Sequence, residues 1–67
     1  MRYYLNGNYA ESTEEITLLE ALSACDEFKE DSIIILNEKY VKQQENYDFV
    51  QINEGDKIEV ISFLAGG

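Results

Sequence analysis

The chain has 67 residues, of which 14 are Asp or Glu and 5 are Lys or Arg, so its formal net charge is -9. One Cys and no His exclude a zinc finger, a Cys-X-X-Cys redox pair and a Cys–His nucleophile within one copy. The excess of carboxylates disfavours contact with nucleic-acid phosphates. No apolar run approaches the ~20 residues of a membrane span, and the N-terminus lacks the pattern of a signal peptide. We therefore expect one cytoplasmic domain that contacts neither nucleic acid nor membrane.

The first eleven residues predict a β-hairpin. Apolar side chains alternate with a period of two over residues 1–5, which is typical of a half-buried strand. Asn6-Gly7 follows, and this dipeptide tolerates the positive φ angles of a two-residue hairpin turn. A short second strand is expected over residues 8–11.

A helix is predicted to begin near Thr17. Thr17 and Glu20 have the spacing of a capping box, in which each side chain accepts a hydrogen bond from an unpaired backbone N–H. The helix should end between Cys25 and Phe28. Its apolar stripe comprises Leu18, Leu19, Leu22 and Cys25. Because it lies on this stripe, Cys25 is interpreted as a small core side chain and not as a sulfur-accepting thiol.

The second half of the chain predicts three further strands, over residues 32–36, 40–41 and 57–63. Asn37-Glu38 and residues 53–56 are turn signals. Residues 42–53 predict a loop with one helical turn, anchored by Tyr47, Phe49, Val50 and Ile52. The order of elements favours a single α+β domain over residues 1–67, with a mixed sheet of four or five strands packed on one helix.

The last predicted strand has two different faces. Ile58 and Val60 share one face, whereas Glu59, Ile61 and Phe63 share the other. Glu59 indicates that the second face is exposed to solvent near the beginning of the strand. Ile61 and Phe63 therefore form either an exposed docking patch or a surface covered by a neighbouring strand or loop. We favour docking.

The sequence ends on Ala65-Gly66-Gly67, which gives a narrow tail with almost no side chains. Such a tail can thread into the active site of another protein. Its chemical handle is the α-carboxylate of Gly67, and Gly66 leaves the approach to that carboxylate unobstructed.

Two blocks of sequence point to a family. The first is Ile35-Leu36-Asn37-Glu38 with Val41, and the second is the run 54–60 leading to Ala65-Gly66-Gly67. Their order and their spacing to the C-terminus resemble the ThiS family of bacterial thiamine-biosynthesis sulfur carriers, which are ubiquitin-like β-grasp proteins. The resemblance covers essentially the whole chain. Two departures are Lys42-Gln43, where members often have Pro-Arg, and the absence of Trp.

The resemblance implies a carrier and not an enzyme. A ThiF-type activating enzyme would use ATP to adenylate the carboxylate of Gly67, and a cysteine desulfurase relay would supply the sulfur that makes a thiocarboxylate. Thiazole synthase would then take this sulfur. The resemblance implies no bound cofactor or metal, and we expect a monomer when the chain is free of partners.

Three other functions stay open at this point. The small subunit of molybdopterin synthase uses the same Gly-Gly thiocarboxylate, although that family often has prolines before the glycines and this chain has no Pro. A protein modifier would form isopeptide bonds through Gly67. For a regulatory domain related to the TGS group, the Gly-Gly end would be incidental.

Overall fold

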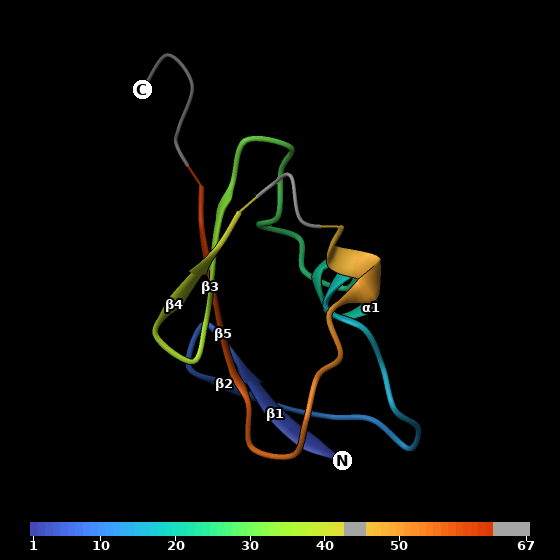
Figure 1. The fold of residues 1–67 in the computed structure, drawn as a ribbon. Coiled ribbons are helices and arrows are strands. Elements are labelled where there is room, and N and C mark those ends of the chain that lie inside the picture. Colours follow the sequence, from blue (N-terminus) through green and yellow to red (C-terminus); the bar gives the residue numbers. More distant parts are fainter. Residues whose placement is uncertain (43–45, 63–67) are drawn as a thin grey trace.

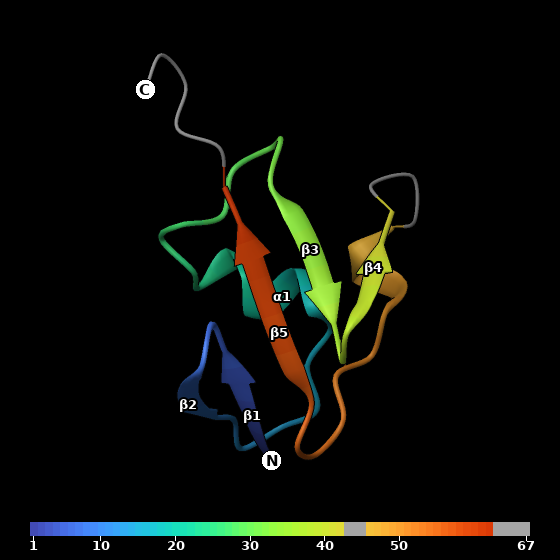
Figure 2. The same cartoon turned by 90° about the vertical axis from the view of Figure 1, so that its left-hand side faces the viewer.

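A computed structural model of the chain describes residues 1–42 and 46–62. Five strands form one sheet in the order β2-β1-β5-β3-β4 (Figure 2). β1 pairs with β5 in parallel, and the other neighbouring strands are antiparallel. This architecture confirms the predicted α+β fold and gives the sheet five strands. The strands are β1 (Arg2–Leu5), β2 (Asn8–Glu11), β3 (Ile33–Leu36), β4 (Lys39–Val41) and β5 (Lys57–Ile61).

Both predicted hairpin turns are present. Asn6 and Gly7 join β1 to β2 with φ angles of 50° and 80°, and Asn37 and Glu38 join β3 to β4 with φ angles of 51° and 69°. Positive φ at both central residues matches the right-handed twist of the paired strands. Among these four turn residues Glu38 is unusual, because a glutamate seldom adopts a positive φ angle.

The helix α1 (Leu18–Ser23) has the predicted start but a different end. The Glu20 N–H donates to Thr17 Oγ1 at 3.2 Å, and the Thr17 N–H donates to Glu20 Oε1 at 3.0 Å, so both capping-box bonds are formed. The prediction that the helix continues to Cys25 is wrong. The N–H of Ala24 donates to the carbonyl of Ala21 at 3.3 Å and the N–H of Cys25 to the carbonyl of Leu22 at 2.9 Å, which closes the last turn after only six helical residues.

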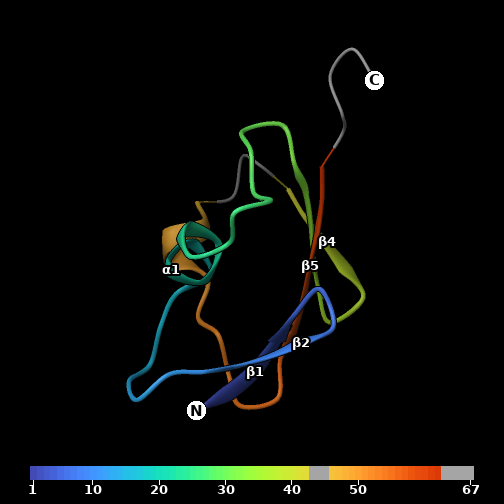
Figure 3. The same cartoon turned by 180° about the vertical axis from the view of Figure 1, so that it is seen from behind.

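The helix α1 and the short 3₁₀ helix η1 (Tyr47–Phe49) lie on the same face of the sheet (Figures 1 and 3). We call this the covered face, and the opposite one the open face. The core lies between the sheet and α1 and is made of Tyr3, Leu18, Ala21, Leu22, Ile34, Val41, Ile52, Ile58 and Val60. Cys25 is a free thiol that is partly buried against this core, as predicted.

Two predicted core residues lie outside the core. Leu19 is 37% exposed, because so short a helix presents only a narrow stripe to the sheet. Phe49 was predicted to anchor the loop but is 85% exposed, whereas Ile52, also a predicted anchor, is buried with 1% exposure. In β3 only Ile34 is fully buried. Its neighbours Ile33 and Ile35 project to the opposite face of the sheet, because side chains alternate along a strand.

Candidate functional site

The strand β5 occupies the centre of the sheet and runs toward the C-terminus of the chain (Figures 1 and 2). It ends at Ile61, two residues earlier than the predicted end. Of the predicted site residues, Ile61 is described, whereas Phe63, Ala65, Gly66 and Gly67 lie outside the described residues. The candidate site is therefore built from the end of β5 and from the open face beside it.

Hydrogen bonds from the loop after α1 fix the end of β5. Ser62 Oγ donates to the carbonyl of Glu27 and lies 2.9 Å from Ser32 Oγ. Ser32 is itself buried and accepts a hydrogen bond from the N–H of Lys29 at 2.8 Å. Ser62 is thus tied to two points of the loop, and the direction in which the chain leaves the sheet is set at this residue. Sequence patterns gave no sign of this contact, because the partners are 30 and 35 positions apart.

An apolar area lies on the open face at the end of β5. Ile61 pairs with Ile33 of β3, and Ile35 pairs with Tyr40 of β4. Cross-strand partners project to the same face of a sheet. Ile61 is 41% exposed and Tyr40 is 61% exposed, so part of this surface is open to solvent. We call Ile33, Ile35, Tyr40 and Ile61 the tail-side patch.

The other half of the open face is polar and aromatic. Tyr4 of β1 pairs with Lys57 of β5 on one side and with Tyr9 of β2 on the other. The rings of Tyr4 and Tyr9 meet edge to face, with centroids 6.2 Å apart. Partial desolvation and the negative charge of Glu11 raise the pKa of Tyr9 above its ordinary value.

A hydrogen-bonded link ties the β3–β4 turn to the start of β5. The buried carboxylate of Asp56 accepts hydrogen bonds from Asn37 Nδ2 at 2.9 Å and from the N–H of Asn53 at 2.7 Å. Asn37 Oδ1 in turn accepts from the N–H of Lys57 at 2.9 Å. Asn37, Asp56 and Lys57 belong to the two sequence blocks that carry the family resemblance. Their role in the structure is to hold β5 in place.

The N-terminal strand β1 is bonded to the turn at residues 53–56, which immediately precedes β5. Arg2 Nε and Glu54 Oε2 form an ion pair of 2.9 Å, and the N–H of Arg2 donates to Glu54 Oε1 at 3.1 Å. The hydrogen bond from the Arg2 N–H, together with the guanidinium, lowers the pKa of the Glu54 carboxyl below its ordinary value. Both side chains are well exposed, so this pair contributes little to stability.

Residues 1–42 and 46–62, which the structure describes, hold neither a metal-binding cluster nor a membrane-spanning helix. Within them, no three Cys, Asp or Glu side chains group closely enough to hold a metal ion. No helix in that same part of the chain is long and apolar enough to cross a bilayer.

Comparison with known proteins decides the family. A model of the ThiS family matches residues 3–67, which is nearly the whole chain. The chain belongs to the ThiS family. A search of curated protein sequences finds no match.

Two solved structures extend this likeness to the ThiS fold. The crystal structure of the thiamine biosynthesis protein ThiS from Geobacter metallireducens has a TM-score of 0.79 at 26% identity, and all of both chains is covered. The solution structure of a thiamine biosynthesis protein from the same organism has a TM-score of 0.77 at 27% identity, covering 100% of this chain and 88% of the other. The sheet and helix described above are therefore the β-grasp fold of this family.

Proposed function

We propose that this protein carries sulfur on the carboxylate of Gly67 for the synthesis of the thiazole moiety of thiamine. The observation that carries the proposal is the match to the ThiS family, which extends through Gly66 and Gly67. Support also comes from the position of β5, the central strand, which leads directly toward these glycines. The five residues after Ser62 can reach at most about 17 Å from the sheet when extended, enough to enter a partner's active site.

The proposed chemistry activates the carboxylate of Gly67, loads it with sulfur and delivers that sulfur, and partner enzymes catalyse these three stages. The Gly67 carboxylate attacks the α-phosphate of ATP on a ThiF-type activating enzyme, and pyrophosphate leaves. The resulting acyl adenylate is a mixed anhydride with a good leaving group, so the terminal sulfur of a persulfide supplied through a cysteine desulfurase relay displaces AMP. A thiol then reduces the acyl disulfide that forms, which releases the thiocarboxylate and leaves the relay cysteine in a disulfide. Thiazole synthase then receives sulfur from the thiocarboxylate. The chain acts as a substrate in each step, and ATP is a substrate of the activating enzyme.

We further propose that the tail-side patch docks the activating enzyme and the synthase. The patch adjoins the residue from which the tail departs, so one partner can bind both together. Ile61 contributes exposed apolar area to the patch, and sequence alternation assigns Phe63 to the same face. An exposed apolar side chain that becomes buried in a pocket of the partner is a typical binding hot spot.

Replacing Ile61 by Gln should weaken binding to the activating enzyme by about tenfold or more, because burying an isoleucine contributes roughly 1.5–3 kcal/mol. The free energy of unfolding should change little, since Ile61 is 41% exposed in the free protein. Calorimetric titration measures the first quantity and thermal melting the second. The matched control is Phe49→Gln, which removes a more exposed apolar side chain from the covered-face side. Equal losses in both variants would contradict docking through the patch.

Growth assays separate the thiamine pathway from its nearest alternative. The gene should restore thiamine-independent growth to a bacterial strain that lacks its own sulfur carrier for thiazole synthesis. It should not restore molybdenum-cofactor activity to a strain that lacks the small subunit of molybdopterin synthase. Rescue of the second strain and not of the first would assign the chain to molybdopterin synthesis. Protein conjugates linked through Gly67 would assign it to protein modification.

A further inference from the structure

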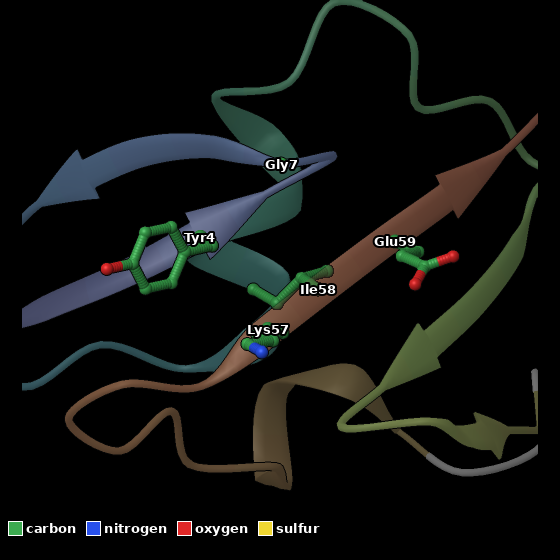
Figure 4. Close-up of a pocket in the computed structure, with 5 residues that line it drawn as sticks. All are labelled: Tyr4, Gly7, Lys57, Ile58 and Glu59. Atoms are coloured by element: carbon green, nitrogen blue, oxygen red, sulfur yellow. The ribbon is translucent and has the colours of Figure 1, made fainter.

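A pocket of about 460 Å³ opens on the other half of the open face, beside the tail-side patch (Figure 4). It is lined by Tyr4, Gly7, Lys57, Ile58 and Glu59. The pocket exists because β1 is short. Its register with β5 covers only Tyr4 with Lys57 and Leu5 with Ile58, and the chain then turns away at Asn6-Gly7.

The turn residue keeps the pocket open. A Cβ built on Gly7 would meet nothing within 4 Å, so the space above the turn is free. Where Ile58 lines the pocket, its carbonyl accepts a hydrogen bond from the Asn6 N–H at 2.8 Å, and the Oδ1 of Asn6 accepts from the N–H of Val60 at 2.7 Å. The backbone at the floor is therefore satisfied, and the groups available to a ligand are side chains.

Among the described residues, neither the Lys57 nor the Glu59 side chain has an ion-pair or hydrogen-bond partner. A partner that covers this surface removes water from both charges. Covering the Glu59 carboxylate with apolar atoms would leave a desolvated, unpaired anion, which is strongly unfavourable. The occupant must therefore bring a hydrogen-bond donor to Glu59, and the formal net charge of -9 favours a cationic donor.

We propose that this pocket receives an arginine side chain of the protein that docks on the open face, an inference that rests on the proposed function. The aliphatic stem of the arginine packs against the ring of Tyr4, which Tyr9 holds in place. Its guanidinium pairs with the carboxylate of Glu59. Arginine suits this place better than lysine, because a planar guanidinium is weakly hydrated, forms two parallel bonds to a carboxylate and stacks on aromatic rings. Lys57 confines the guanidinium to the Glu59 side by repulsion.

The first test measures affinity for the activating enzyme in the full-length protein. Glu59→Gln should raise the dissociation constant at least tenfold, and Glu59→Lys should raise it further. The control Glu15→Gln removes another exposed carboxylate, from the segment between β2 and α1. It should change the dissociation constant less than twofold. Lys57→Gln should leave affinity unchanged or improve it. A loss with Lys57→Gln and none with Glu59→Gln would mean that the partner brings an acid, which overturns the proposal.

The second test does not depend on the proposed function. N-acetyl-arginine amide is titrated into the ¹⁵N-labelled protein, with N-acetyl-citrulline amide as an uncharged probe of the same shape. The arginine probe should produce saturable shifts at the amides of Gly7 and Glu59, and these should vanish in Glu59→Gln. Equal shifts with citrulline, or shifts confined to other residues, would overturn the proposal. If arginine binds here but the gene does not restore thiamine synthesis, the proposed function fails and this inference stands.

Discussion

Replacement of Asp56 by Ala is expected to destabilise the protein by about 2–3 kcal/mol, because two hydrogen bonds to a buried carboxylate are lost together. Asn37 Nδ2 and the N–H of Asn53 would both lose their acceptor. In a domain of this size, 1 kcal/mol shifts the melting temperature by roughly 4–8 °C. A fall of about 10–20 °C in thermal melting is therefore the expected result.

The control for this experiment is Asp31→Ala. Asp31 is also acidic but exposed, so its removal should cost less than about 0.5 kcal/mol. The loss of stability in Asp56→Asn should lie between those of Asp56→Ala and Asp31→Ala, since the asparagine keeps an acceptor for Asn37 but loses the charge. The double variant of Asn37 and Asp56 should cost less than the sum of the single variants, because both act on one hydrogen-bonded link. Strict additivity, or an Asp56→Ala variant as stable as Asp31→Ala, would contradict a structural role for these motif residues.

Deletion of Gly66 and Gly67 is expected to abolish adenylation without changing the fold. The core that the structure describes is built from residues 3–60, and the two deleted residues carry no side chains, so the melting temperature should stay within about 1 °C of that of the full chain. Pyrophosphate exchange catalysed by the activating enzyme should fall to background, because the shortened tail no longer places a carboxylate at the α-phosphate of ATP.

A second tail variant separates the effect of tail length from the effect of side-chain size. Gly66→Val keeps the terminal carboxylate but adds a branched side chain to the narrow tail. We expect about a 10²-fold loss of exchange activity, the size of effect that a misplaced reacting group produces. Full activity of the deletion variant would show that the glycines are incidental. Full activity of the valine variant alone would show only that the partner's channel is wider than proposed.

Sequence patterns were sufficient where the interaction is local. Asn6-Gly7 and the pair Thr17 and Glu20 each specify a turn or a cap through residues that are neighbours in the chain, and both are observed. The alternation of β5 also holds, since Ile58 is buried and Ile61 is exposed. Period-two patterns survive because every second side chain must face the same side of a strand.

The patterns were insufficient where burial depends on distant partners. Leu19 fits a helical stripe, but the helix ends after six residues and leaves it 37% exposed. Phe49 was one of four predicted anchors of its loop, yet it is 85% exposed, whereas the predicted anchor Ile52 is buried. No local pattern could indicate that Asp56 meets a side chain 19 positions away, or that Ser62 is tied to the loop after α1.

The open-face pocket also depends on residues that are distant in sequence, so no local pattern could indicate it. Alternation placed Glu59 on a wet face and no more. The pocket arises from the early end of β1 and from a turn residue without a side chain. Both are consequences of how two strands far apart in sequence are aligned in the sheet.

The mass of the intact protein tests the central claim most directly. The chain is incubated with ATP, the activating enzyme, a cysteine desulfurase and cysteine, and is then weighed by mass spectrometry. Replacement of one carboxylate oxygen by sulfur at an activated acyl group predicts a gain of about 16 Da, absent when Gly66 and Gly67 are deleted. A gain of about 32 Da that survives this deletion and disappears in Cys25→Ser would place the sulfur on the thiol as a persulfide. That result, or no gain in mass at all, would contradict a sulfur carrier acting through Gly67.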